Sequence, residues 1–137
     1  MGKLVELTFD AATTAKLSKG FKLFPAIFKA ELGKAVVKLV LIIERKAKQL
    51  CPVGKTRRGI PGGTLRNSIT PVVVGWAQGF VGTNTHYAPY VEYGTTHGTT
   101  KIPARPFLEP AYLEGAKQAP AIFEAALKRA LAKAKLA

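Results

Sequence analysis

The sequence predicts a single α+β domain over residues 1–137, with a long amphipathic N-terminal helix and a C-terminal helix packed on a small antiparallel β-sheet. Three observations lead to this fold class. A helical period runs through residues 24–50, two runs of β-forming residues follow, and an Ala-, Leu- and Lys-rich segment fills residues 110–137. With 137 residues and 47% hydrophobic content, the chain can bury one core.

The first 23 residues are predicted to form a short strand and an arm. The stretch KLVELTF, residues 3–9, alternates between two sets of side chains, as a strand does. Asp10 is a good N-cap for a helix that starts within residues 10–22. This segment has no apolar run of the kind found in secretory signal peptides, so we expect no signal peptide.

Apolar residues at three- and four-residue spacing predict an amphipathic helix of about seven turns over residues 24–50. Pro25 is expected in its first turn, and Pro52 just beyond its end. The apolar face comprises Phe28, Leu32, Ala35, Val36, Leu39, Ile43 and Leu50. The other side is interpreted as a solvated face or an electrostatic contact surface, and it carries Glu31, Lys34, Lys38, Arg45 and Lys48.

Two strands are expected next, at about residues 65–74 and 78–83, with Gly75 and Gly79 marking the turn between them. Pro71 favours an edge strand or a bulge, because proline cannot donate to a central ladder. These two runs form the predicted small sheet.

The remaining chain divides into an irregular part and a helical part. Residues 86–109 are dense in aromatic residues, glycine and proline and show no regular period. Residues 110–137 have a helical apolar face, and Pro120 predicts a kink or two abutting helices.

The charge is the strongest feature of the composition, with 21 Lys and Arg against 8 Asp and Glu, a net charge of +13. Such a charge favours nucleic acid, an anionic membrane or an acidic protein surface as partners, or simply keeps the protein soluble. No apolar run is long enough to cross a bilayer, and we expect no membrane association. The single cysteine, Cys51, cannot form an internal disulfide, which favours a reducing, cytoplasmic origin.

The glycine-rich basic loop at residues 53–64 is predicted to be exposed and mobile. Gly54-Lys55-Thr56 resembles the end of a P-loop, but Gln49 occupies the position of the first glycine, and a helix precedes the loop instead of a strand. A nucleotide site is therefore not expected. The possible phosphate or partner contacts in and beside this loop are Lys55, Arg57, Arg58 and Arg66.

Catalytic constellations are not evident. The acidic residues form no D-x-D or E-x-x-H pair, and Cys51, His86 and His97 have no recognised metal-ligand spacing. We therefore expect no catalytic residues, no metal and no cofactor; a metal-dependent nuclease acting through Glu92 stays open as an alternative. Aromatic residues could stack on nucleic-acid bases, but core or interface packing is the favoured interpretation for Tyr87, Tyr90, Tyr93 and Phe107.

Several motifs follow the basic helix in fixed order. The helix ends with Ala47 and Pro52, and the later stretches are GTLRNSI from Gly63, VGT from Val81, YA with VEYGT from Tyr87 to Thr95, and PARPFLEPA from Pro103. In this order they resemble the small head–tail joining proteins of long-tailed bacteriophages, also called neck or tail-completion proteins. The resemblance covers roughly residues 25–125. In this family the loop before Leu-Arg has a compact Thr-Gly, whereas this chain has Gly63-Thr64 and an upstream insertion, GKTRRGIPG.

The resemblance implies a structural virion protein rather than an enzyme. It implies a homo-oligomeric ring of six, or alternatively twelve, subunits at the head–tail junction, acting in tail completion or head–tail joining. The partners would be adjacent connector and tail tube proteins, with non-specific contact to packaged DNA, in the virion and, during assembly, in the host cytoplasm. A ring requires two unlike patches on each subunit. The alternative is a small basic protein that binds DNA without sequence preference.

Five residues are candidate anchors for the core or for a subunit interface. The prolines Pro103 and Pro106 are expected to hold an extended segment that lays the next side chains into a hydrophobic groove. The candidate anchors are Tyr90, Glu92, Tyr93, Phe107 and Leu108.

Overall fold

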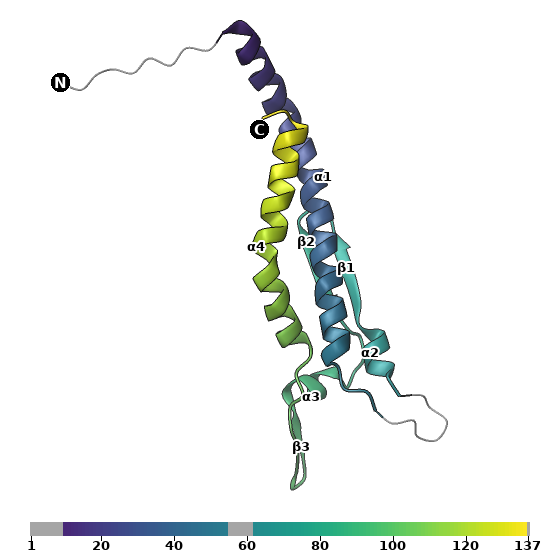
Figure 1. Cartoon of the computed structure of the whole chain (residues 1–137). Coiled ribbons are helices and arrows are strands. Elements are labelled where there is room, and N and C mark those ends of the chain that lie inside the picture. Colours follow the sequence, from purple (N-terminus) through teal and green to yellow (C-terminus); the bar gives the residue numbers. More distant parts are fainter. Residues whose placement is uncertain (1–9, 55–61, 137) are drawn as a thin grey trace, which may run out of the picture.

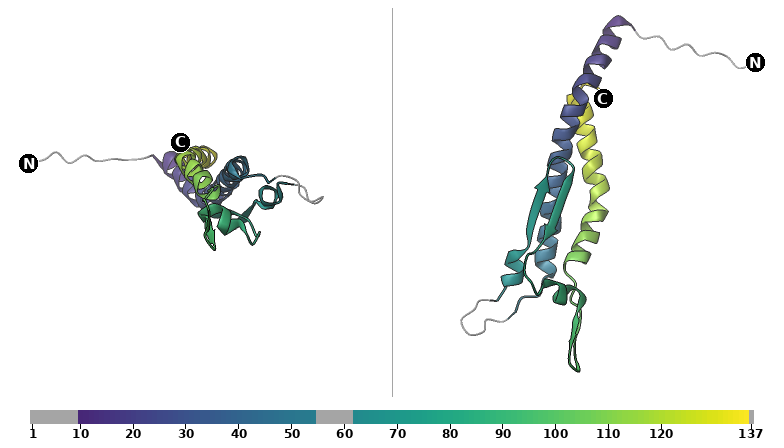
Figure 2. Two further views of the ribbon diagram at one scale, coloured as in Figure 1. Left: turned by 90° about the horizontal axis from the view of Figure 1, so that it is seen from below. Right: turned by 180° about the vertical axis from the view of Figure 1, so that it is seen from behind.

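A computed structural model describes residues 10–54 and 62–136, and confirms the α+β class. Two long helices lie side by side, and a β-hairpin lies along the first of them (Figure 1). In the view from behind in Figure 2, the hairpin lies in front of the first helix, which also packs against the last helix. The elements in chain order are α1 (Ala11–Leu50), α2 (Thr64–Ser68), β1 (Thr70–Val74), β2 (Gln78–Gly82), α3 (Ala88–Tyr93), β3 (Thr95–His97), β4 (Thr100–Ile102) and α4 (Leu108–Lys133).

Helix α1 starts earlier than the apolar period predicts. The N-cap role of Asp10 is confirmed, because its carboxylate accepts a hydrogen bond from the Thr13 N–H at 2.6 Å. The placement of Pro25 in the first turn is wrong, because Pro25 lies inside the 40-residue helix. Pro25 is exposed, so water can serve the carbonyl that loses its helical partner. The helix ends at Leu50, just before Pro52, as expected. The strand expected at residues 3–9 lies outside the described residues.

Helices α1 and α4 pack closely through small side chains. A Cβ atom on Gly115 would lie 2.4 Å from Ile43 Cγ1, so this contact needs glycine on α4. Ala35 of α1 and Ala126 of α4 are also fully or almost fully buried between the helices. Helix α4 runs through the exposed Pro120 as one element, so the expected division into two abutting helices is wrong.

Glu31 joins the two helices electrostatically, which is the second of the two interpretations that the polar face of α1 left open. Its side chain is 2% exposed, and Arg129 Nε lies 2.9 Å from its carboxylate. Lys133 and Lys34 also pair with Glu31, the latter at 3.4 Å. Two of these partners come from α4, about a hundred residues later in the chain, so the period of α1 alone could not reveal them. Hydrogen bonds from Lys133 and then Arg129 lower the pKa of Glu31 to about 2.

The low pKa of Glu31 predicts an acid-sensitive contact between the helices. Folding lowers this pKa from its ordinary value of 4.5 to about 2, so the stabilisation is present above 4.5 and is lost as the pH falls toward 2. Urea unfolding across this range should show the free-energy difference between wild type and Glu31→Gln shrinking as the pH falls. A difference that stays constant with pH would contradict this account of the pair.

The β1–β2 hairpin lies with one face on α1. Its register pairs Val72 with Phe80 and Val73 with Gly79. A Cβ on Gly79 would lie 2.4 Å from Val40 Cγ1, so this glycine permits the strand to lie directly on the helix. Near the turn, Lys29 Nζ lies 5.6 Å from the centre of the Trp76 ring, which adds a cation–π contact between helix and hairpin.

The first predicted strand is shorter than expected, because residues 65–68 form helix α2. Gly63, with φ 93°, turns the chain into this helix. The Ser68 hydroxyl donates to the Leu65 carbonyl at 2.6 Å and lies 2.5 Å from the Thr83 hydroxyl. Thr85 completes the hydroxyl cluster at 2.8 Å from Ser68, and the cluster fastens the end of α2 to the chain after β2.

The segment expected to be irregular contains α3 and the β3–β4 hairpin. This prediction is wrong because elements of three to six residues are too short to show a period. Gly98, with φ 62°, makes the tight turn between the two strands. The β3–β4 hairpin projects from the end of the molecule in Figure 1.

Candidate assembly interface

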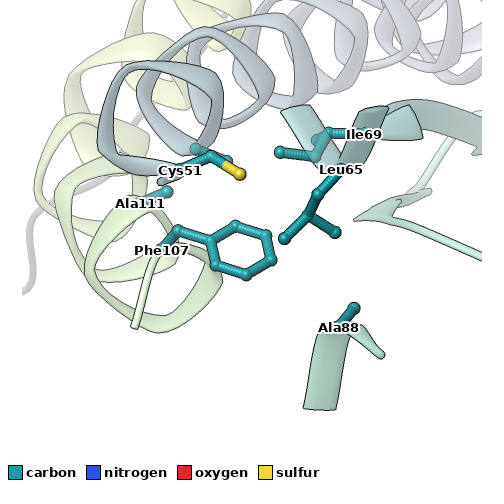
Figure 3. Packing of buried hydrophobic residues seen from close by; sticks show 7 residues of the cluster. Cys51, Leu65, Ile69, Ala88, Phe107 and Ala111 are labelled. Atoms are coloured by element: carbon teal, nitrogen blue, oxygen red, sulfur yellow. The ribbon is translucent and has the colours of Figure 1, made fainter. Parts of the chain in front are cut away.

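Phe107 is the centre of the main core. Its side chain is fully buried, and it precedes α4 at the point where four helices converge (Figure 3). The cluster around it brings together one or two small or branched side chains from each helix, namely Ala47, Cys51, Leu65, Ile69, Ala88 and Ala111. Phe107 is therefore a core anchor within this chain, and Leu108 beside it is half-buried against the same cluster.

Glu92 fastens α3 to the start of α4. One carboxylate oxygen accepts the backbone N–H groups of Phe107 at 2.9 Å and Leu108 at 3.1 Å, and the other accepts that of Glu109 at 2.9 Å. Helix α4 has no capping side chain of its own, so Glu92 satisfies N–H groups that the first helical turn leaves free. Burial alone would raise the pKa of Glu92, but the three hydrogen bonds together outweigh it and lower the pKa.

The segment between Glu92 and Phe107 closes back on α3. The Arg105 N–H donates to the Val91 carbonyl at 2.8 Å. Gly94 has φ 75°, and a Cβ there would lie 2.8 Å from the Ile102 carbonyl oxygen and from Ala104 N. The motif residues of the two stretches VEYGT and PARPFLEPA thus form one structural unit, in which Gly94 permits the close return of the chain.

The two tyrosines among the candidate anchors do not belong to the core of this chain. Tyr90 is 56% exposed and Tyr93 is 78% exposed. Their assignment to a contact with a neighbouring subunit stays a prediction. Arg66 is exposed on α2, whereas Lys55, Arg57 and Arg58 lie outside the described residues.

An apolar groove of about 810 Å³ lies between α1, β2 and α4. Its lining from α1 includes Val36 and Val40, and β2 contributes Gly79 and Val81. The helix α4 side carries Tyr112, which is exposed. A groove of this size with an apolar lining can receive side chains from another molecule.

The opposite face of the β1–β2 hairpin is also apolar. Side chains alternate across a strand, so Gly79 and Val81 line the groove while Val72, Val74 and Phe80 point away from it. These three side chains are 52%, 52% and 60% exposed. We call them the outer hairpin face. In the described part of the chain no third strand extends this sheet, so both strand edges are open.

Among residues 10–54 and 62–136, no group of three His, Cys, Asp or Glu side chains is placed to hold a metal ion. The carboxylate of Glu92 is occupied by three backbone N–H groups, which disfavours the nuclease alternative. Burial raises the pKa of the Cys51 thiol, so this cysteine stays protonated and unreactive.

The groove and the outer hairpin face were not predicted from the sequence. The signal for the hairpin face was present in the run Val72-Val73-Val74, because a strand that is apolar on both faces is typical of burial on both faces.

No helix within the described ranges is long and apolar enough to cross a membrane. Comparisons of the chain with protein-family models, curated proteins and solved structures gave no match.

Proposed function

We propose that this chain is a structural, non-enzymatic virion subunit of a phage neck, which assembles into a ring at the head–tail junction. Its role is in tail completion or head–tail joining. Subunit assembly is supported by the β1–β2 hairpin, which is apolar on both faces while this chain covers only one. The neck assignment rests on the motif resemblance, whose residues Glu92, Gly94 and Phe107 have structural roles here.

Two unlike surfaces on one subunit suit a closed ring. The groove is concave, the outer hairpin face presents exposed apolar side chains, and the two lie on opposite sides of the hairpin. A contact between the hairpin face of one subunit and the groove of the next is heterologous, and repetition of such a contact closes a ring when the rotation permits. Tyr93, which is exposed and lines the groove, adds aromatic area there, as interfaces favour.

Electron microscopy of particles assembled with this gene inactivated tests the role. We expect DNA-filled heads beside unattached tails, and the length of those tails would separate joining from tail completion. Normal, infectious particles would refute the neck assignment. Complementation with Phe80→Asp should fail, whereas Phe21→Asp, the same change at an equally exposed site on α1, should restore particles.

A second candidate function is sequence-independent DNA binding, which is favoured by the net charge of +13. The two candidates differ in what an isolated subunit does. A neck subunit needs no affinity for free duplex DNA, whereas a DNA-binding protein must bind it as a monomer.

A further inference from the structure

A basic pocket lies at the end of the helix pair, far along α1 from the core around Phe107. It has a volume of about 480 Å³ and lies between the first turns of α1 and the last turn of α4. Four lysines line it: Lys16 and Lys19 from α1, Lys133 at the end of α4, and Lys135 just after it. The lining contains no acidic residue. None of these residues lines the groove or belongs to the outer hairpin face.

The fold brings these lysines together through a close helix contact at Gly20. A Cβ there would lie 2.6 Å from Leu136 Cδ2 and 2.8 Å from the Ala134 carbonyl oxygen, so only glycine permits this approach. After α4, Lys135 adopts the left-handed conformation with φ 57°, and the Leu136 N–H donates to the Leu131 carbonyl at 2.9 Å. This folded-back turn places the last lysines of α4 against α1.

The pocket has a net positive charge that residues 10–54 and 62–136 neutralise only in part. Lys133 is shared with Glu31. No ion pair joins Lys16, Lys19 or Lys135 to an acidic residue within the described portion of the chain. Lysines at the end of α4 also offset the negative end of its helix dipole, but those of α1 have no such role. Like charges gathered in this way repel one another and favour an anionic ligand.

We propose that this pocket binds backbone phosphates of duplex nucleic acid without reading the base sequence. Lysine ammonium groups contact phosphate as point charges, which gives affinity and no base specificity. A membrane surface is disfavoured, because a helix lying in a membrane must bury a free apolar side. Beside the pocket Phe21 and Leu23 are 65% and 48% exposed, so a short apolar stretch of α1 is free there. Further along, the apolar side of α1 is engaged: Ala35 is buried against α4, and Phe24 and Phe28, both half-buried, stack on each other at 5.4 Å.

The test measures binding of the full chain to a fluorescent duplex of arbitrary sequence at several salt concentrations. Four phosphate contacts predict that affinity falls about 100-fold between 50 and 200 mM salt. The double variant Lys16→Glu/Lys19→Glu should bind at least about tenfold more weakly at low salt, with a salt slope smaller by about two. Lys101→Glu/Lys117→Glu is the matched control, because it changes the net charge equally at exposed sites outside the pocket.

A second variant tests the geometry without changing the charge. Gly20→Val should push the end of α4 away from α1 and weaken duplex binding, while circular dichroism still shows a folded, helical protein. Equal loss of affinity in the pocket variant and its control would overturn the site, since binding would then follow net charge alone. Binding to anionic lipid vesicles that exceeds duplex binding and is lost in the pocket variant would also overturn it.

This inference does not depend on ring assembly. Oligomer size is measured separately, for example by sedimentation velocity, and the pocket lies outside the proposed subunit contact. Duplex binding by a chain that forms no ring would support the pocket and argue against the neck role. A ring that does not bind duplex DNA would support the neck role and overturn the proposed phosphate site.

Discussion

Replacing Phe107 with alanine is expected to destabilise the protein by about 3–5 kcal/mol, the largest effect of any single substitution considered. The ring is fully buried where four helices meet, and its neighbours include small residues such as Ala88 and Ala111. Small neighbours on rigid helices cannot collapse into the space that the ring leaves, so a cavity remains. Urea unfolding followed by circular dichroism measures the loss directly.

The control for this prediction is Phe80→Ala, because Phe80 has the same side chain but is 60% exposed. Its stability should change by less than about 1 kcal/mol. Similar losses for the two variants would mean that the core is not centred on Phe107. Phe80→Ala should instead reduce self-association, which makes the pair of variants a test of folding and assembly together.

Removing the carboxylate of Glu92 should have the second-largest effect. Glu92→Ala leaves three backbone N–H groups at the start of α4 without their acceptor, and we expect a loss of about 3 kcal/mol. The free energy of unfolding of Glu92→Gln should lie between those of Glu92→Ala and wild type. The amide oxygen can still accept from the backbone, whereas the amide NH₂ faces a backbone N–H donor. Urea unfolding at neutral pH measures both losses.

The pH dependence separates the charge of Glu92 from its packing. Its pKa is lowered from 4.5 in the folded protein, so its contribution is present above 4.5 and is lost as the pH falls through the folded value. The difference between wild type and Glu92→Gln should therefore narrow in acid. Glu109→Gln is the control, because the exposed Glu109 side chain should contribute only a few tenths of a kcal/mol. A larger effect at Glu109 than at Glu92 would contradict the capping role.

The long elements were predictable from sequence, and the way they are joined was not. The periods of α1 and α4 exceed three turns, so the existence and type of both helices could be predicted. The burial of Glu31 depends on Arg129 and Lys133, which are distant in sequence, so its helical position alone could not decide between solvent and an electrostatic contact. Proline was over-interpreted as a helix boundary at Pro25 and Pro120, because both are exposed and water can serve the carbonyl that loses its helical partner.

Only some of the candidate residues could be chosen from the sequence for a physical reason that agrees with the structure. Phe107 was singled out as a large apolar residue after prolines, and it is buried. Glu92 was named without a mechanism, since a carboxylate that caps a helix fifteen residues later leaves no local pattern. The basic pocket was missed because its lysines come from opposite ends of the chain. Only the close contact at Gly20 brings them together.

Because of the outer hairpin face, salt should favour self-association of this protein while it weakens binding to nucleic acid. This face favours association between copies, because Val72, Val74 and Phe80 are exposed beside open strand edges. The net charge of +13 opposes association through long-range repulsion between copies. At physiological ionic strength this repulsion is screened beyond about 8 Å, so added salt lets the apolar faces meet. The same salt weakens contacts between lysine and phosphate. Rising ionic strength should thus shift the chain from dispersed and nucleic-acid-bound toward self-associated.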